Sequence, residues 1–531
     1  MKSNKIHRSD TGLFSKQQLD MVYDQAIYKD FISQPFSIDA FEDQMNMKLK
    51  QYPEEFRKVL RDSLINQYDR VEMTTSTASN IDSILDNKTY TITSGHQLSL
   101  FTGPLYFIIK IVHVIKLCTE LSKKYPQHRF VPVYWMASED HDFKEIQSFH
   151  VFNKTITWNT NQKGPVGRFD LSGLDEVKTQ LTELFVNHPD SEVMNLIDQL
   201  DGETYADVVR GLVNALFGSD GLVILDGDDV ELKQLFAPIV QKELDEQFSF
   251  KEVLKLNDTL SALNVKLQVV PRETNLFYIE NGIRQRIVQE GNQFVIDGVG
   301  VYSKEDIFSL LAEHPDRFSP NVILRPVYQE FILPNLAYVG GSGEIAYWLQ
   351  LKGVFDLLEV PYPLIQVRNS IVWLDNATRT KFNKYGFKLE DLFKEVDVWK
   401  KDYVLNNTET APDFSALETA GSALKDVLKN TIITFDPFGE QQVKAEVARL
   451  DKQLQGIKAK GIKKMKAQHE NAMKAIEQIK QKLFPENDLQ ERHVNFFQFC
   501  ADGNVQSRIG DLSEAIEPFS NDLILLVDDL H

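Results

Sequence analysis

The sequence predicts an α/β fold, in which a mostly parallel β-sheet is covered by helices on both faces and a long helical segment follows near the C-terminus. Short β-rich runs alternate with helical segments, which is typical of such a sheet. Most of these runs end in a polar or glycine-rich cluster, and parallel sheets bind their ligands outside the carboxyl ends of the strands. Residues 441–484 carry apolar side chains at spacings of four and three, a heptad pattern that predicts a coiled coil.

Length and composition limit the class of protein. The 531 residues are too many for one hydrophobic core, and at roughly 100–200 residues per domain two to four units are expected. A formal net charge of −19 disfavours binding of nucleic acid by bulk charge. The two cysteines, Cys118 and Cys500, exclude a disulfide framework and a zinc site of four thiolates. A polar N-terminus and an interrupted apolar run at 100–117 predict neither a signal peptide nor a membrane span, so a cytoplasmic protein is expected.

The first elements of the predicted fold follow in order. Helical spacing with few breakers over residues 20–86 predicts a helical lead-in. The β-branched run at 89–93 predicts a strand, and the apolar run at 105–121 predicts the buried helix after it. Further apolar runs predict strands at residues 130–136, 221–225, 322–327 and 362–367.

The uneven spacing of these runs predicts how the core is interrupted. An α/β core over residues 1–375 is expected to carry insertions at about 150–215 and 230–320, because both stretches are far longer than a crossover helix requires. The first insertion begins with an alternating segment at 149–158, and the second contains a hairpin-like segment at 276–296.

The C-terminal part differs in composition from the core. Residues 376–495 are expected to form a helical coiled-coil domain, with one long helix that contains a skip at Gly461. The partner of this helix is either the segment 389–428 of the same chain or a second copy of the protein. Residues 496–531, which include a strand-like run at 523–527, are expected to pack back onto the protein.

The loop after the first predicted strand is a candidate anion site. A glycine-containing loop between a strand and a helix brings backbone N–H groups and the positive end of the helix dipole together, which suits a phosphate or a carboxylate. An ordinary loop is the alternative of about equal weight. The candidate residues are Ser94, Gly95, His96, Gln97, Thr102 and Gly103.

An acidic cluster after the second strand is a candidate catalytic site. Like charges that are packed together usually serve metal, ammonium or proton handling. The alternative, of about equal weight, is a solvated loop that caps the next helix. The residues are Glu139, Asp140, His141 and Asp142. The acidic run at 226–229 is weaker, and a simple turn is favoured there.

The segment 325–348 combines charged residues, closely spaced glycines and aromatic residues. Glycines allow close approach of the backbone to a ligand, and the surrounding polar residues favour a binding loop over a merely flexible one. The candidate binding residues are Arg325, Gln329, Glu330, Asn335, Gly340, Gly341, Gly343, Glu344, Tyr347 and Trp348.

Three blocks, at residues 94–106, 131–142 and 325–348, together resemble the cysteine ligase family of bacillithiol biosynthesis (BshC). The resemblance covers nearly the whole chain. It implies a Rossmann-like, nucleotide-binding core related to class I aminoacyl-tRNA synthetases, with connecting insertions and a coiled-coil arm used for dimerisation. It also implies an amide-forming carbon–nitrogen ligase, which joins the carboxyl group of cysteine to the amine of glucosaminyl-malate and so forms bacillithiol.

The implied reaction assigns expected cofactors and roles to the candidate residues. Amide formation from a free carboxylate is uphill, so ATP with Mg²⁺ is expected as the activator, and no zinc is expected. The His96 loop with Thr102 and Gly103 is expected to contact an anion or phosphate, and His141 is expected to assist proton transfer. The substrate ammonium or Mg²⁺ is expected to be bound by Glu139, Asp140 and Asp142. Arg325 is expected to hold the malate carboxylates and Glu330 the sugar or amine, while the pocket is expected to be lined by Gly340, Gly341 and Gly343.

Two other functions stay open at this point. One is a non-catalytic coiled-coil scaffold with a vestigial nucleotide pocket, which the lack of a lysine-rich phosphate loop favours and the polar clusters at the strand ends disfavour. The other is a nucleotidyltransferase that acts on another small molecule. The expected partners are small-molecule substrates and a second copy of the chain, without nucleic acid or membrane.

Overall fold

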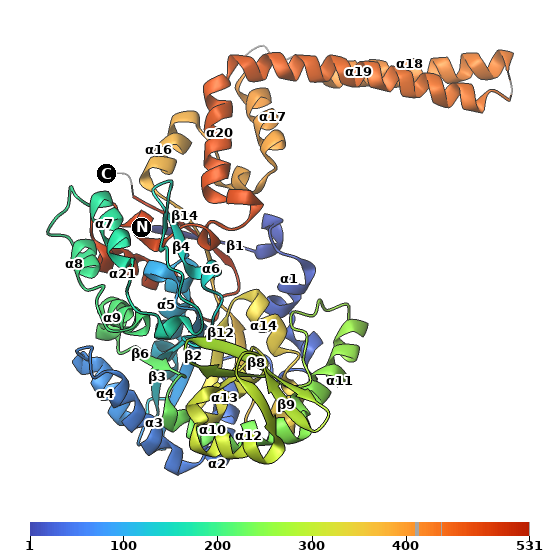
Figure 1. Ribbon diagram of the computed structural model, residues 1–531. Coiled ribbons are helices and arrows are strands. Elements are labelled where there is room, and N and C mark those ends of the chain that lie inside the picture. Colours follow the sequence, from blue (N-terminus) through green and yellow to red (C-terminus); the bar gives the residue numbers. More distant parts are fainter. Residues whose placement is uncertain (409–413, 437, 530–531) are drawn as a thin grey trace. The chain divides into compact units, whose positions relative to one another are not determined.

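The computed structural model describes residues 1–408, 414–436 and 438–529 (Figure 1). The described chain forms two compact units. The first consists of Met1–Trp373 and Leu489–Leu526, and the second contains Leu374–Asp488 and the described residues from Val527 onward. No helix in the described part of the chain is long and apolar enough to cross a membrane.

The centre of the first unit is a five-stranded sheet of order β13-β12-β2-β3-β6, in which every neighbouring pair is parallel (Figure 1). Every strand residue except Arg129 is buried, as expected for a sheet with both faces covered. The chain moves from β2 to β3 and β6 in one direction and from β12 to β13 in the other, so the winding reverses between β2 and β12. Ligands of open α/β sheets bind at such a reversal. The strands are β2 (Thr89–His96), β3 (Arg129–Met136), β6 (Val223–Asp226), β12 (Asn335–Gly340) and β13 (Leu364–Val367).

One predicted strand is wrong. The run at 322–327 is a turn that leads into the first residues of helix α13 (Leu324–Ile332), and the strand of the sheet is the following β12. Leu324, Val327 and Tyr328 are buried at helical spacing, and Pro326 lies in the first turn, where its missing N–H costs nothing. The other four predicted strands are confirmed by β2, β3, β6 and β13.

Helices cover the sheet largely where the sequence predicts them. The buried helix α5 (Tyr106–Lys124) contacts β2, β3 and β12. The predicted lead-in is helical, and among its helices α2 contacts β12 and β13 while α3 and α4 contact β6. The lead-in helices are α1 (Lys16–Tyr23), α2 (Ala40–Gln51), α3 (Glu54–Gln67) and α4 (Thr75–Ser83).

Two stretches between the strands of the sheet carry additional structure. The first, between β3 and β6, holds α6 (Phe143–Ile146), a hairpin of β4 (Ser148–Val151) and β5 (Lys154–Thr157), and helices α7 (Leu174–Leu184), α8 (Glu192–Asp198) and α9 (Tyr205–Phe217). The second, between β6 and β12, holds α10 (Val230–Glu246), α11 (Phe248–Ala262) and an antiparallel sheet of order β10-β9-β8-β7-β11. The predicted hairpin is confirmed by β7 (Leu276–Glu280) and β8 (Ile283–Glu290), which are followed by β9 (Gln293–Ile296), β10 (Gly300–Ser303), α12 (Lys304–Glu313) and β11 (Phe318–Pro320).

The two ends of the chain meet in a small three-stranded sheet. The predicted strand near the C-terminus is confirmed by β15 (Leu523–Val527), which lies between β1 (Lys2–Ile6) and β14 (Ser370–Leu374). The helix before it, α21 (Val505–Ala515), contacts α5 and α8.

The second unit is helical. Its helices α18 and α19 run side by side as a long arm, and α17 contacts both α19 and α20 (Figure 1). The helices are α16 (Asn376–Tyr385), α17 (Val396–Asn407), α18 (Phe414–Phe435), α19 (Glu440–Gln468) and α20 (Glu470–Leu483).

The predicted single long helix is interrupted at His469, whereas Gly461, the expected skip in the heptad spacing, lies inside α19. His469 has φ −110° and ψ 32°, and it separates α19 from α20. Its Nε2 lies 3.2 Å from Thr408 Oγ1, and its ring packs edge-on against Tyr403 of α17. These contacts with another helix hold the kink, and a heptad pattern does not reveal them.

The first half of the heptad pattern lies in α19, which packs against α18 of the same chain. Gly421 of α18 is so close to Leu454 of α19 that a Cβ atom at Gly421 would lie 2.5 Å from Leu454 Cδ1. Ion pairs join Lys458 to Glu418 and Lys425 to Asp451 across the two helices. Of the predicted partner segment 389–428, residues 409–413 lie outside the described part of the chain.

Candidate functional site

A cavity of about 500 Å³ lies at the carboxyl edge of the central sheet, where the chain leaves β2, β3 and β12. We call it the sheet-edge cavity. It lies at the reversal of the winding between β2 and β12, where open α/β sheets bind ligands. The candidate residues that line it are Gly95, His96, Gln97, Glu139, Asp140, Arg325, Glu344 and Tyr347.

His96 ends β2 and lies in the wall of this cavity as a neutral imidazole. Its ring stacks on Phe107, with the ring centroids 5.0 Å apart, and its Nε2 is 3.3 Å from Ser99 Oγ. Burial, reinforced by the positive charges of Lys110 and Arg368, lowers the pKa of His96 well below its usual value. The side chain can therefore donate or accept a hydrogen bond, but it brings no positive charge to an anion at neutral pH.

Lys110 and Glu344 form an ion pair at the border of the cavity. Lys110 is buried in α5 and donates a hydrogen bond to the main-chain oxygen of Gly95 at 3.0 Å. Glu344, in α14 (Ser342–Trp348), pairs with this ammonium group and also accepts hydrogen bonds from the Tyr338 hydroxyl at 3.3 Å and the Gly341 N–H at 3.2 Å. One charge of the cavity wall is thus neutralised within the protein. Lys110 was not among the predicted site residues, because its only signal in the sequence is that of a lysine inside an otherwise apolar helix.

The acidic cluster separates into residues inside and outside the cavity. Glu139 pairs with Lys233 at 2.7 Å, and Asp140 accepts a hydrogen bond from Gln97 at 2.8 Å. His141 and Asp142 do not line the cavity. The reason is that Asp140 Oδ1 accepts the N–H groups of both residues and so turns the loop away from the sheet edge.

The cavity is also lined by arginines that were not among the predicted site residues. Arg284 and Arg286 belong to β8, and their guanidinium groups lie 4.0 and 5.2 Å from the centroid of the Phe277 ring. Arg284 also donates a hydrogen bond to Pro320 O at 3.2 Å and lies 2.9 Å from Nδ1 of His141. Burial, then the positive charge of Arg284, lowers the pKa of His141. The alternation of strand residues puts positions 284 and 286 on one face, which was the available signal.

Arg325 is held in the cavity by polar side chains. Its NH1 donates to Gln329 Oε1 at 3.0 Å and its NH2 donates to the Tyr347 hydroxyl at 3.3 Å. Its guanidinium carbon is 5.9 Å from the Tyr338 ring centroid. Arg325 thus lines the cavity, and its role in binding a ligand stays a prediction.

Three candidate residues near Arg325 lie behind the cavity wall, so the predicted contact of Glu330 with substrate does not fit the structure. Gln329, Glu330 and Asn335 are fully buried. Gln329 Nε2 and Asn335 Nδ2 donate to Glu330 Oε1 at 2.8 and 2.7 Å, and Thr93 Oγ1 donates to Asn335 Oδ1 at 2.8 Å. This network supports Arg325 through Gln329 and reaches no ligand itself.

The remaining candidate residues do not line the sheet-edge cavity either. Ser94 donates to Val339 O at 2.7 Å inside the sheet, and Trp348 is buried with its ring stacked on Tyr338. The backbone of the Thr102–Gly103 loop is fixed from elsewhere, because Asn495 Nδ2 donates to the main-chain oxygens of Phe101 and Gly103 at 2.8 and 2.6 Å. The three glycines lie outside the cavity lining, between the end of β12 and the first turn of α14: Gly340, Gly341 and Gly343.

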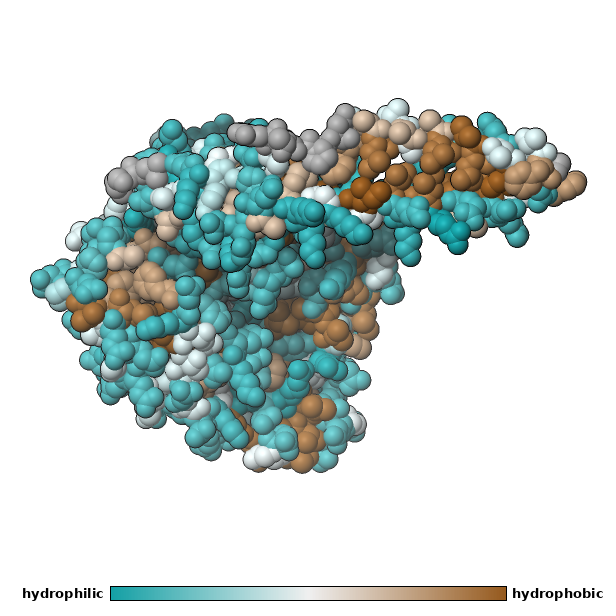
Figure 2. Space-filling model, turned by 90° about the horizontal axis from the view of Figure 1, so that it is seen from above, coloured by the Kyte–Doolittle hydropathy of each residue, from teal (hydrophilic) through white to brown (hydrophobic). Residues whose placement is uncertain are grey.

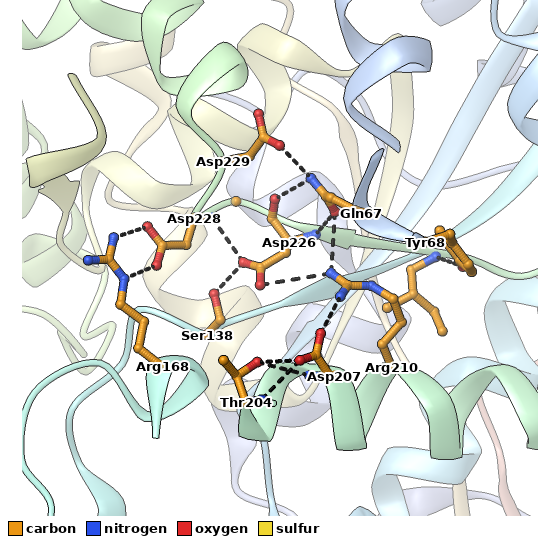
Figure 3. A network of polar contacts seen from close by, with 12 residues as sticks. Gln67, Tyr68, Ser138, Arg168, Thr204, Asp207, Arg210, Asp226, Asp228 and Asp229 are labelled. Atoms are coloured by element: carbon orange, nitrogen blue, oxygen red, sulfur yellow. Dashed lines mark hydrogen bonds and ion pairs between the residues drawn. The ribbon is translucent and has the colours of Figure 1, made fainter. Parts of the chain in front are cut away.

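The acidic run at 226–229 proves to be more than a turn. Asp226 accepts a hydrogen bond from Ser138 and lies 3.9 Å from Arg210, and Asp228 binds Arg168 through both carboxylate oxygens at 2.6 and 2.8 Å (Figure 3). Burial raises the pKa of Asp226 to about 6, although Arg210 opposes the shift. These side chains border a second cavity of about 380 Å³, and Ser138 lines both cavities.

The side chains that line the sheet-edge cavity determine which of the expected cofactors it can hold. The arginines of the sheet-edge cavity fit the phosphate oxygens of a nucleotide, because guanidinium groups bind phosphate bidentately. Among residues 1–408, 414–436 and 438–529, no group of three or more histidine, cysteine, aspartate or glutamate side chains is arranged to hold a metal ion.

The parallel sheet, the reversal of its winding and the cavity at that reversal define a Rossmann-like α/β protein with a helical arm. The chain belongs to the BshC family of bacillithiol biosynthesis. The family model for the "N-terminal Rossmann-like domain" of BshC matches residues 1–369, and the model for its "C-terminal coiled-coil domain" matches residues 371–527.

Relatives that match along most of their length support this membership. A protein of Flavobacterium johnsoniae is 38% identical over 522 residues, which cover 95% of this chain and 96% of the relative. A protein of Christiangramia forsetii is 34% identical over 99% of both chains. Both carry the name "Putative cysteine ligase BshC". These names support a ligase of the bacillithiol pathway.

A solved structure also matches, but weakly. The crystal structure of a "putative arginyl t-RNA synthetase" from Campylobacter jejuni covers 88% of this chain and 97% of its own, with 10% identity and a TM-score of 0.21. A likeness at this TM-score carries no argument. The predicted relation to class I synthetases therefore stays a prediction.

Proposed function

We propose that this protein joins the carboxyl group of cysteine to the amine of glucosaminyl-malate and so forms the amide bond of bacillithiol. The observation that supports this most is the sheet-edge cavity, in which arginines and carboxylates from separate parts of the chain meet in about 500 Å³. Such a cavity suits two charged metabolites that must be held side by side.

The arginine side of the cavity is proposed to bind the malate carboxylates. Among the described residues, none of its four arginines forms an ion pair with a carboxylate, although two of the three acidic residues of the cavity are paired with buried lysines. Unpaired guanidinium groups in a cavity favour an anionic ligand, and their fork matches a carboxylate bidentately. The arginines are Arg272, Arg284, Arg286 and Arg325.

The opposite side is proposed to bind the amine. Glu139 and Asp140 line the cavity next to each other after β3 and offer carboxylate oxygens to an amino group. His96 is proposed to donate a hydrogen bond to the reacting carboxyl group, because its imidazole is neutral and lies in the same wall. His141 is no longer proposed for proton transfer, since its side chain lies outside the cavity.

ATP is proposed as the activator, with Mg²⁺ as its companion. The carboxylate oxygen that is lost must leave with an activating group, because amide formation from a free carboxylate is uphill. When bound, ATP would supply the free energy of this activation.

A direct assay tests the proposal. The purified full-length protein is mixed with cysteine, glucosaminyl-malate and Mg-ATP, and bacillithiol is measured by mass spectrometry. We expect product from the wild type and a KM for glucosaminyl-malate that is raised about tenfold or more in R286A. R449A, which changes an exposed arginine of α19, is the matched control. Absence of both product and ATP turnover in the wild type would refute the ligase.

We also propose that the arm forms a homodimer. The space-filling view shows apolar side chains along the arm (Figure 2). Leu424 and Val427 of α18 are 50% and 60% exposed, and Ile457 of α19 is 55% exposed. The contact between α18 and α19 leaves these apolar residues uncovered, and a second copy of the chain is the partner that the resemblance to the family implies.

A further inference from the structure

Lys233 lies in the first turn of α10, with its ammonium group buried among three oxygen atoms. Its side chain is 3% exposed. Nζ donates hydrogen bonds to Asp228 Oδ1 and to the main-chain oxygen of Asp316, both at 2.8 Å. It also pairs with Glu139 Oε1 at 2.7 Å. Each of the three N–H groups of the ammonium therefore has an oxygen to face, and the position of this group is fixed.

The carboxylate of Asp228 is also held in place, by Arg168 of the first insertion. Arg168 Nε donates to Asp228 Oδ2 at 2.6 Å, and Arg168 NH2 donates to Asp228 Oδ1 at 2.8 Å (Figure 3). Burial alone would raise the pKa of Asp228, but Lys233 and Arg168 outweigh it and lower the pKa. A row of alternating charges thus runs from Arg168 through Asp228 and Lys233 to Glu139, which lines the sheet-edge cavity.

The two carboxylate oxygens of Glu139 have different surroundings. Oε1 is buried and forms the 2.7 Å ion pair with Lys233 but accepts no regular hydrogen bond, whereas Oε2 has neither an ion pair nor a hydrogen bond from any residue in the described part of the chain. We propose that Lys233 is a positioning residue, which holds Glu139 through Oε1 so that Oε2 accepts a hydrogen bond from the amine of the substrate. This inference rests on the proposed function, in which Glu139 contacts that amine.

The charge of Lys233 is as important as its position. Without it, the carboxylates of Glu139 and Asp228 would be left with the guanidinium groups of Arg168 and Arg284 as neighbouring positive charges. A carboxylate that loses a buried ion-pair partner also loses the contact that fixes its orientation. Loss of Lys233 should therefore weaken the binding of the amine as Glu139 loses its fixed position.

A double-mutant cycle tests this inference. The variants K233Q, E139Q and E139Q/K233Q are compared by kcat/KM for glucosaminyl-malate and by calorimetric binding of glucosaminyl-malate to the full-length protein. We expect K233Q to lower kcat/KM and affinity about tenfold or more in the wild-type background, and to change neither in the E139Q background. K233R, which keeps the positive charge, is expected to recover part of the loss. K242M removes an exposed ion pair on the same helix and is the matched control, with wild-type values.

Equal losses from K233Q in both backgrounds would refute the inference, because an ion pair that only stabilises the fold acts independently of Glu139. If K233Q alone does not fold, the affinities of E139Q and E139Q/K233Q for glucosaminyl-malate are compared instead. Equal affinities support the inference, and a lower affinity of the double variant overturns it. Failure of the proposed function is recognised separately, since the wild type then forms no bacillithiol, whereas the binding cycle can still be read.

Discussion

Arg284 and Arg286 show how single residues of an insertion can complete a site on the core. They occupy alternate positions of β8, and the alternation of a strand already predicts that they share a face. The sequence pattern does not show which part of the protein this face of β8 is turned towards. Their places in the wall of the sheet-edge cavity follow from the way the second insertion folds over the ends of β2 and β3, which is a tertiary contact.

Asp226 leads to a prediction at the residue scale. Its pKa in the folded protein is about 6, above the value of 3.8 for a free side chain. A raised carboxyl pKa contributes stability that is present at low pH and is lost as the pH rises through the folded pKa. We therefore expect the free energy of unfolding of the wild type, relative to D226N, to fall by up to about 3 kcal/mol between about pH 4 and pH 7. Urea unfolding at several pH values measures this difference.

The matched control for Asp226 is D198N, at an exposed aspartate of α8. The difference between the wild type and D198N should not change over the same pH range. A difference between the wild type and D226N that rises with pH would contradict the assigned environment of Asp226.

Part of the candidate site could be predicted from residue types alone. His96 and Glu139 follow buried strands, and the carboxyl ends of parallel strands meet at one edge, so their meeting was predictable. Gln329 and Glu330 could not be separated from ligand-binding residues in this way. A polar residue that serves a ligand and one that satisfies a buried network look alike in a sequence, because burial is decided by elements distant in the chain.

At the scale of elements, α13 and β12 show where sequence patterns fail. The run at 322–327 is apolar enough for either a strand or a helix, and short apolar runs do not distinguish the two. The four strands that were predicted correctly are β-branched or aromatic runs that end in turn-forming or polar residues. The break at His469 was also missed, because its cause is a contact with α17.

The helical arm gives a prediction at the element scale. Gly456 of α19 has open space where a Cβ atom would lie, whereas a Cβ atom at Gly421 of α18 would meet Leu454. Alanine is favoured over glycine inside a helix by roughly 1 kcal/mol. We expect G456A to slow hydrogen exchange in the arm, and G421A to give a smaller gain or a loss because Leu454 must move. Hydrogen exchange measured by mass spectrometry compares the two. Equal protection in both variants would contradict the packing of α18 on α19.

At the scale of the whole molecule, the proposed homodimer can be tested by mass. Sedimentation equilibrium of the wild type should give twice the mass of the chain. The variant V427E/I457E places charges on exposed apolar positions of the arm and should sediment as a monomer. Q455E, a substitution at an exposed polar position of α19, is the control and should remain a dimer. A monomeric wild type over the whole accessible concentration range would refute the dimer.

The bond from Asn495 to the loop at Phe101 and Gly103 has a consequence for biosynthesis. During translation, the loop at Phe101 and Gly103 is made almost four hundred residues before Asn495, whose side chain fixes the loop by hydrogen bonds. The strand β15, which joins the N-terminal β1 to β14, emerges later still. A nascent chain should therefore keep the neighbourhood of His96 unfinished until residue 495 has been made and folded, and a product that ends before this residue should be recognised as unfolded by proteases of the cell.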